Sequence, residues 1–330
     1  MPRLLGRHRS RLGGLMVQIE LAADRPQPEL AAQDSADALA IRRYLSASRS
    51  TATWRRYATM QRQWRRYCDG HGWQGGATPE RVSAWLAHLA DSGRSWSTIQ
   101  VAAAALRTFS SEDAAVLDHP GVRATLAGIA RVVGKAPKRQ ARGLSIDEMR
   151  QILARIGGGS LAEARDRALL AVWWLSACRS SEMANLNLAD LDWRPQGVAL
   201  HLRRSKTDQD GEGRQVAIPG GPATEALRTW LERLADHGRR DGAVWCALDG
   251  GGGRLSAPAL VEILRRRAAT AGIADVSGHS LRRGHVTAAA LLGVPMPVIA
   301  QQTGHRSLDT VLRYYEAARL FDHTSARGLL

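Results

Sequence analysis

The chain has 330 residues, enough for two domains with buried cores, and 44% of them are apolar, as in ordinary globular proteins. Its 46 basic and 31 acidic side chains leave a formal charge of +15. This charge favours a polyanionic partner, although a role in solubility alone is the competing interpretation.

The longest apolar run, 168–178, is too short to cross a bilayer. The three cysteines form no Cys-x-x-Cys pair, which argues against a zinc site or a disulfide framework and predicts a soluble cytoplasmic protein.

The N-terminal part divides into a tail and a helical region. Residues 1–45 begin with arginines and continue through prolines and acids, which predicts a poorly ordered tail that leads into a short helix. Residues 46–134 carry apolar side chains at helical spacing between glycines. Helices are expected from a cap at Ser50 or Thr51 and over 79–91, 97–109 and 122–133. Because no strand pattern interrupts them, they predict a small all-α domain.

The first helix of this domain combines aromatic and basic side chains. Trp54, Tyr57 and Trp64 recur at helical spacing, which favours packing in the core over stacking on bases. The same helix carries five arginines, more than solvation requires. We therefore predict that DNA phosphates are contacted by Arg55, Arg56, Arg62, Arg65 and Arg66.

Residues 135–143 are predicted to form a basic linker, because Gly134 precedes them, Pro137 and Gly143 lie among them, and they contain no acidic residue. A solvated tether is one interpretation. The other, which we favour, is a segment that lies across DNA phosphates while it joins two halves of a clamp. The predicted DNA-contacting side chains of this linker are Lys135, Lys138, Arg139 and Arg142.

The remaining residues, 144–330, predict a mostly helical domain with one small antiparallel sheet. A capped helix start is expected at Ser145. Alternating apolar residues predict strands over 198–202 and 215–218, joined by a turn at 208–213. Further helices are expected over 165–175, 222–236, 258–270, 281–292, 296–302 and 308–320.

Several polar residues of this domain are candidates for phosphate chemistry. His-x-x-Arg alone is a weak signal, because it occurs four times, but only the copy at His279 and Arg282 precedes another histidine, His305, and a tyrosine pair. Arg179 lies at a helix start, where the helix dipole favours anions, although an arginine that caps the junction through Glu182 is an alternative.

Two further residue types need separate arguments. Lys206 follows the first strand in a chain that otherwise uses arginine, which suggests a group that can lose its proton, whereas a solvated hairpin lysine is the alternative. Tyrosine can act as a covalent nucleophile. Leu308, Val311, Leu312 and Tyr315 form one apolar stripe on the last helix, whereas Tyr314 lies about 100° away from it. Tyr314 is therefore the predicted nucleophile.

Six of these positions, in chain order and with nine residues from the second histidine to the tyrosine, resemble the catalytic set of the tyrosine recombinase (phage integrase) family: Arg179, Lys206, His279, Arg282, His305 and Tyr314. The resemblance covers about residues 46–320. It implies a mainly α protein, in which a small helical, SAM-like core-binding domain precedes a mostly helical catalytic domain with a small antiparallel sheet. Cys178 and the lack of a glycine ahead of Arg179 depart from the commoner Gly-Leu-Arg form, and Arg283 stands where a histidine often follows.

The resemblance implies a site-specific recombinase that cleaves and rejoins DNA through a 3′-phosphotyrosyl intermediate, without metal, ATP or another cofactor. Tyr314 would attack the phosphate, which Arg179, Arg282 and His305 would bind. Lys206 would protonate the leaving oxygen and His279 would accept the tyrosine proton. Glu182 would orient Arg179 or His279.

The partners implied are double-stranded DNA and three further copies of the chain, in a homo-tetramer on two recombination sites. Accessory DNA-bending proteins are further expected partners, and a membrane is not. The segment 321–330 is expected to pass to a neighbouring protomer. Two alternatives remain: a type IB topoisomerase-like enzyme that relaxes DNA, and a DNA-binding relative without catalysis.

Overall fold

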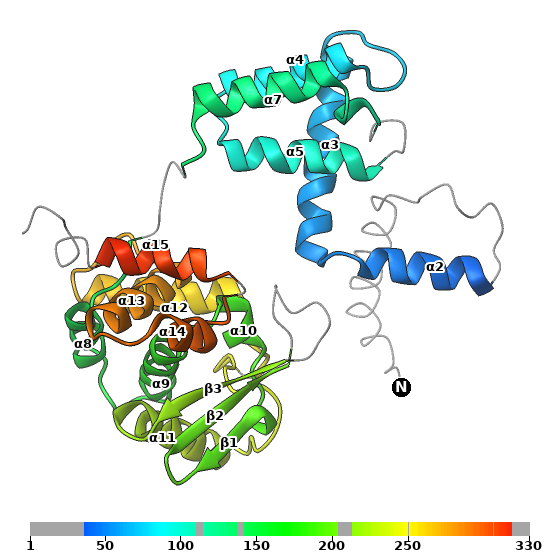
Figure 1. Cartoon of the computed structure of the whole chain (residues 1–330). Coiled ribbons are helices and arrows are strands. Elements are labelled where there is room, and N and C mark those ends of the chain that lie inside the picture. Colours follow the sequence, from blue (N-terminus) through cyan, green and yellow to red (C-terminus); the bar gives the residue numbers. More distant parts are fainter. Residues whose placement is uncertain are drawn as a thin grey trace, which may run out of the picture. The chain divides into compact units, whose positions relative to one another are not determined.

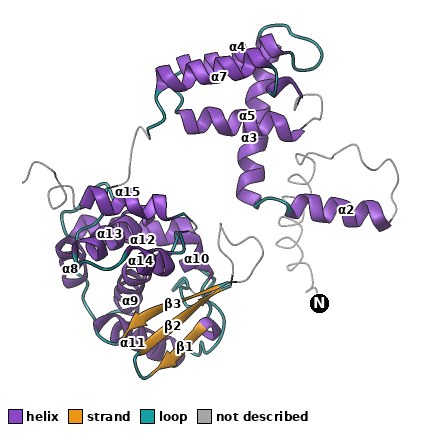
Figure 2. Ribbon diagram, viewed as in Figure 1, coloured by secondary structure: helices purple, strands orange, loops and turns teal. Residues whose placement is uncertain are grey.

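The computed structural model of the chain describes residues 36–109, 115–136, 142–203, 213–249, 251–305 and 307–318 (Figure 1). It divides into two compact units, Met1–Arg139 and Gln140–Leu330, and the division falls within the expected linker. Helices dominate both units, and one three-stranded antiparallel sheet lies in the second (Figure 2). This confirms the predicted fold class. None of the helices in the described ranges combines the length and the apolar character that a bilayer crossing requires.

Two helices of the first unit, α3 and α4, have starts capped by short polar side chains. The Ser50 hydroxyl accepts the backbone N–H of Thr53, and Thr78 caps the next helix in the same way. One helix starts two residues earlier than predicted, because Pro120 is suited to the first turn, where its missing N–H costs nothing. The helices are α2 (Ala36–Ala47), α3 (Thr51–Gly70), α4 (Pro79–Asp91), α5 (Trp96–Phe109) and α7 (Pro120–Val133).

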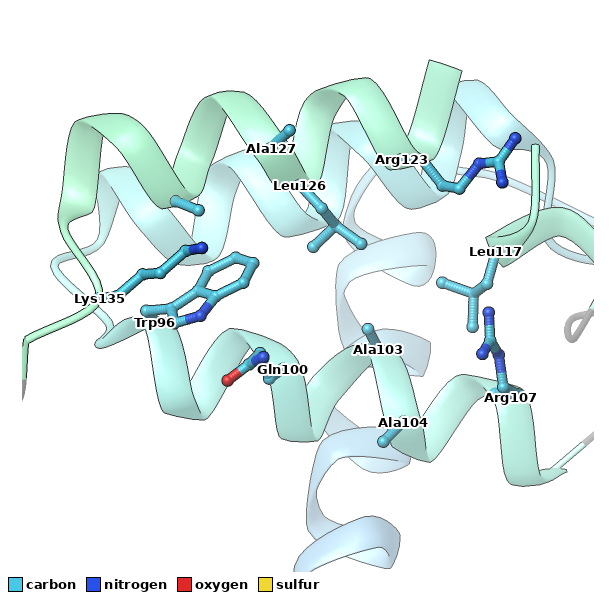
Figure 3. Close-up of a pocket in the computed structure, with 11 residues that line it drawn as sticks. Trp96, Gln100, Ala103, Ala104, Arg107, Leu117, Arg123, Leu126, Ala127 and Lys135 are labelled. Atoms are coloured by element: carbon cyan, nitrogen blue, oxygen red, sulfur yellow. The ribbon is translucent and has the colours of Figure 1, made fainter. Parts of the chain in front are cut away.

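The core of the first unit is aromatic at its centre. Trp64 of α3 and Trp85 of α4 are both buried, with ring centroids 5.3 Å apart. Tyr57 is also buried, so the packing predicted for Tyr57 and Trp64 is confirmed, whereas Trp54 is only half-buried. A cavity of about 490 Å³ lies between α5 and α7, and Figure 3 shows Trp96 and Lys135 among the side chains that line it.

The second unit surrounds one nearly buried helix, α9, which packs against α11 and α13. The elements are α8 (Ile146–Ala154), α9 (Leu161–Ser176), α10 (Ser180–Asn185), η1 (Leu188–Asp190), β1 (Leu191–Arg194), β2 (Gly197–Leu202), β3 (Arg214–Pro219), α11 (Pro222–Asp236), α12 (Ala257–Thr270), α13 (Gly278–Leu291), α14 (Met296–Thr303) and α15 (Leu308–Ala318). The strands run in the order β1-β2-β3, and Leu202 pairs with Arg214 where β2 ends and β3 begins.

Two features of this unit differ from the sequence prediction. α9 begins four residues earlier than expected, because Ser160 and Glu163 form a reciprocal capping box. β1 was not predicted, since its four residues are too few to display an alternating pattern. Close packing of α13 on α9 depends on Gly284, where a Cβ atom would collide with the Leu144 carbonyl and the Trp174 ring. This packing brings the start of α13 beside the end of α9.

Candidate active site

The turn after α9 positions the first predicted site residue. Arg179 is the N-cap of α10, and its backbone N–H donates to Oε2 of Glu182 at 3.0 Å. Its Nη1 donates to Oε1 of the same carboxylate at 2.6 Å. The capping alternative is therefore present in the structure, and it leaves the remaining guanidinium donors of Arg179 available to another acceptor.

The same turn shows why glycine is the commoner residue two positions ahead of Arg179. Ala177 ends α9 in the left-handed conformation, with φ of 48°, which glycine adopts more readily than any residue with a Cβ atom. The turn aims the Ala177 carbonyl at Arg282 of α13, whose Nη1 donates to it at 2.8 Å. The commoner glycine would thus fit this position, and alanine adopts the same conformation here.

Arg282 is the most deeply buried cation of the site, only 6% exposed. Besides the Ala177 carbonyl, its Nη1 donates to the Thr303 carbonyl at 2.5 Å, and its Nη2 donates to Nε2 of His305 at 2.9 Å. Burial and the positive charge of Arg179 lower the pKa of Arg282 to about 10, so it remains charged at neutral pH. Two backbone carbonyls fix this guanidinium before any ligand arrives.

His305 accepts a hydrogen bond from Arg282, and this fixes its tautomer. A guanidinium can only donate, so Nε2 holds the lone pair and Nδ1 carries the proton. Nδ1 then donates to Oγ1 of Thr303 at 2.7 Å, and this hydroxyl donates to the Ile299 carbonyl. Burial, followed by the charges of Arg282, Arg179 and Arg214, lowers the pKa of His305 to about 4. The ring is therefore neutral at pH 7.

Arg214, which was not among the predicted site residues, is a third arginine of this site. It is the first residue of β3, and its Nη2 donates to Oε2 of Glu182 at 3.0 Å. Its Nη1 donates to the Gln302 carbonyl, three residues ahead of His305. In a chain this rich in arginine, only its place beside a predicted strand could have drawn attention to it.

The charges of this cluster do not balance. Arg179, Arg214 and Arg282 contribute three positive charges, the Glu182 carboxylate contributes one negative charge, and His305 is neutral. Burial acts to raise the pKa of Glu182, but the charge of Arg214 and the hydrogen bonds of Arg179 outweigh it, and the pKa is lowered. The cluster thus carries an excess of two positive charges in a largely buried place, which favours the binding of an anion.

The predicted tyrosine lies on α15, which packs against α13 and α14. Tyr314 and Tyr315 are both half-buried, and both pack against the cluster that includes Val286 and Val311. The Arg283 guanidinium lies over the Tyr314 ring, 5.3 Å from its centroid. Tyr315 packs against the core as its place in the predicted stripe implies, but Tyr314 packs there as well, and Leu308 of that stripe is 48% exposed. Position on the helix therefore does not distinguish the two tyrosines, and the assignment of Tyr314 stays a prediction.

The other predicted residues fall into three groups. His279 is exposed in the first turn of α13, three residues ahead of Arg282, so the two share one side of the helix. Arg142 donates to Glu148 at 2.7 Å and to the Ala274 carbonyl, so its guanidinium holds the second unit together. The predicted residues Lys138, Arg139 and Lys206 and the segment 321–330 lie outside the described residues.

The five arginines of α3 are all exposed, on the helix whose aromatic residues fill the core of the first unit. Lys135 lines the cavity between α5 and α7. These positions leave the basic side chains accessible to a polyanion, while their contacts with DNA stay predictions.

Comparison with known proteins gives a consistent family assignment. Residues 142–320, 179 of the 330, match the model of the "Phage integrase family". The chain is 28% identical over 296 residues to an "Integrase/recombinase xerD homolog" of Selenomonas ruminantium, with 86% of each chain covered. It is 34% identical over 187 residues to "Tyrosine recombinase XerD" of Mycobacterium tuberculosis, which covers 54% of this chain and 57% of that one.

Solved structures share the fold. A XerH site-specific recombinase bound to palindromic difH substrate has a TM-score of 0.66 at 18% identity, with 88% of this chain and 86% of that chain covered. A lambda integrase tetramer bound to a Holliday junction has a TM-score of 0.55 at 17% identity, with 94% and 88% covered. The two-unit helical architecture is therefore one that recombinases use.

Proposed function

This chain belongs to the phage integrase family and is a tyrosine-type site-specific recombinase, and on that premise we propose that it cleaves and rejoins DNA through a covalent bond between Tyr314 and the 3′-phosphate. The observation that carries the proposal is the buried excess of two positive charges around Glu182. A pentacoordinate phosphorane needs such preorganised charge, because negative charge develops on its non-bridging oxygens.

The reaction balances with groups of this chain alone. The Tyr314 oxygen forms a bond to phosphorus as the bond to the 5′-oxygen breaks. His279 accepts the tyrosine proton, and Lys206 protonates the 5′-oxygen that leaves. Rejoining reverses these steps, because the phosphotyrosine conserves the energy of the phosphodiester. The proposal therefore includes neither a metal ion nor another cofactor.

Binding of the phosphate would rearrange the bonds of Arg282. A non-bridging oxygen would replace His305 as the acceptor for Nη2, while the two backbone carbonyls keep Nη1 in place. The lone pair on Nε2 of His305 would then be free, and the nearby anion would raise the pKa of this ring. His305 would take up a proton and donate it in a hydrogen bond to the phosphate.

The DNA and the assembly complete the proposal. The exposed arginines of α3 would bind phosphates of the duplex and set its position, without reading sequence. Recombination of two sites needs four active sites, so we infer a homo-tetramer, with accessory DNA-bending proteins as further partners. The lambda integrase found as a tetramer on a Holliday junction supports this assembly. A cytoplasmic location, expected from the free cysteines, also belongs to the proposal.

A nicked suicide substrate tests the chemistry. Recombination junctions sequenced from cells that express the protein would give the site, and a half-site with a nick beside the scissile phosphate would lose its leaving strand after cleavage. We expect a covalent protein–DNA adduct that forms in excess EDTA, persists in Tyr315→Phe and disappears in Tyr314→Phe.

Two outcomes would overturn parts of the proposal. If the wild-type protein forms no adduct on its own site, or if Tyr314→Phe still forms one, the assigned chemistry is wrong. If the protein relaxes one supercoiled circle but does not exchange strands between two sites, it acts as a type IB topoisomerase-like enzyme.

A further inference from the structure

Arg214 lies between Glu182 of α10 and the end of α14. Its Nη2 contacts Glu182, and its Nη1 contacts the Gln302 carbonyl at 2.7 Å, near the end of α14. It begins β3, directly after the segment that contains Lys206. One side chain therefore ties the start of a strand to the carboxylate that caps α10 and to the helix that precedes His305.

The surroundings of Arg214 are adapted to hold it. Gly304 ends α14 with φ of +67°, and a Cβ atom there would lie 2.7 Å from Nε and 3.0 Å from Cδ of Arg214. Nε is buried and has no hydrogen-bond partner, a state not found for any other buried side-chain nitrogen or oxygen in the described part of the chain. An unpaired buried donor opposes folding, so its presence indicates that this arginine is kept for its other contacts.

These contacts determine how the Glu182 carboxylate orients Arg179 and how far it neutralises the charge of Arg179. Arg179 reaches Oε2 through its backbone N–H and Oε1 through Nη1, while Arg214 approaches Oε2. With Arg214 present, two guanidinium groups share one carboxylate, and neither is fully neutralised. Without Arg214, Glu182 would form a one-to-one ion pair with Arg179 and would lose the group that limits its rotation.

We propose that Arg214 is a positioning residue of the recombinase, which holds the Glu182 carboxylate so that Arg179 keeps both its orientation and its unneutralised charge for the scissile phosphate. Arg214 itself does not contact DNA in this proposal, because its two Nη groups donate to the protein. The inference rests on the proposed function of the cluster as the phosphate site.

Arg267 provides a matched control. Its side chain is 16% exposed, against 18% for Arg214, and it also shares a buried carboxylate, that of Asp166, with other arginines of the same unit. The experiment compares Arg214→Gln, Arg214→Lys and Arg267→Gln by the single-turnover rate of adduct formation at saturating protein. DNA affinity and thermal unfolding are measured in parallel.

We expect Arg214→Gln to slow adduct formation by about 100-fold, the effect of misplacing a catalytic group by about 1 Å, while DNA affinity is unchanged. Arg214→Lys should recover part of the rate, because it restores the charge without the fork of donors. Arg267→Gln should keep the wild-type rate in its folded fraction. In an Arg179→Gln background, Arg214→Gln should cost little further, because residues that act through one another are not additive.

The outcomes separate two failures. If the wild-type protein forms no adduct, the proposed function fails, and the role of Arg214 fails with it. If the wild type forms the adduct and Arg214→Gln matches its rate, or if the losses of Arg179→Gln and Arg214→Gln multiply, only the role of Arg214 is refuted. If Arg214→Gln does not fold, Arg214→Lys becomes the test. A wild-type rate of adduct formation in Arg214→Lys would refute the positioning role of the two Nη donors, and a reduced rate at unchanged DNA affinity would support it.

Discussion

Two clusters in the second unit have the same composition but different settings. In each, three arginines accompany one buried carboxylate: Arg179, Arg214 and Arg282 with Glu182, and Arg165, Arg266 and Arg267 with Asp166. The Asp166 cluster joins α9 to α12. Its side chains are engaged with one another, and Arg266 is 56% exposed, so water screens its excess charge.

The Glu182 cluster lacks this screening. Arg282 is buried and directed at a neutral histidine and two carbonyls, and the neighbouring arginines help to lower its pKa to about 10. The comparison shows that the number of arginines does not define an anion site. Under the proposed function, burial of the charges and donors that are not saturated by carboxylates make the Glu182 cluster a phosphate site, whereas the Asp166 cluster only joins two helices.

The largest expected difference between the Asp166 and Glu182 clusters is in their contribution to stability. Both oxygens of Asp166 accept arginine donors at 2.8 to 3.1 Å, so Asp166→Asn should lower the free energy of unfolding by about 3–5 kcal/mol, the cost of breaking a buried ion pair. Glu182→Gln should also be destabilised, but inorganic phosphate at constant ionic strength should restore its stability, because an anion can enter that site. Urea unfolding measures both, and equal rescue of the two variants by phosphate would remove the distinction.

The second difference is in catalysis. Arg282→Gln should slow adduct formation by about 100- to 1000-fold at saturating DNA, since it removes a preorganised donor from the transition state. Arg267→Gln should leave the rate of its folded fraction unchanged. Single-turnover assays of the two proteins make the test, and similar losses in both would show that the clusters act on the reaction only through the fold.

The third difference is a pH dependence. The pKa of His305 is lowered from 6.5 to about 4 in the folded protein, so below pH 6.5 the unfolded chain binds a proton that the native site refuses. The contribution of His305 to the free energy of unfolding is therefore fully present above pH 6.5 and is lost as the pH falls from 6.5 towards 4. His285, whose burial also lowers its pKa to about 4, adds to the same slope.

Unfolding curves across this pH range, for the wild type and His305→Asn, isolate the share of His305. The variant should show a shallower decline, and phosphate should flatten the wild-type decline, because a bound anion raises the pKa of the ring. An unchanged slope in His305→Asn would contradict the assignment.

The smallest expected difference concerns the backbone beneath each cluster. The Glu182 cluster depends on the left-handed Ala177, whereas Asp166 lies in regular helix. In Ala177→Gly, relief of about 1–2 kcal/mol of conformational cost offsets the lost methyl and the added chain entropy, so stability should stay within about 1 kcal/mol of the parent. Ala168→Gly, in the buried interior of α9, has no such relief and should be clearly less stable. Equal losses would mean that position 177 carries no conformational cost.

Much of the fold was predictable because local signals agreed with tertiary packing. The helices over 79–91 and 222–236 have the predicted bounds, since a proline fixes each start and the periodic apolar face continues to the end. β1 was missed because four residues hold too little pattern. The expected apolar stripe of α15 was wrong at Leu308, because a helical periodicity cannot say how far the neighbouring helices extend to cover it.

The site was predictable where residues are close in sequence or belong to a known ordered set. Arg179 and Glu182 meet one helical turn apart, and Arg282 and His305 meet as the family resemblance implies. Arg214 could not be foreseen, because its contact with Glu182 spans 32 residues and arises only when β3 lies beside α10. Neither the sequence pattern nor the structure distinguishes the two tyrosines, since both rings pack against the same core.

That choice is the most direct test of the proposed chemistry. Trypsin digestion of the adduct should release one peptide, residues 314–319, which contains both tyrosines. After nuclease digestion of the DNA, fragmentation by mass spectrometry locates the remaining nucleotide on one residue. We expect a 3′-phosphate linkage to Tyr314, and a nucleotide on Tyr315, or on a residue outside this peptide, would contradict the proposed chemistry.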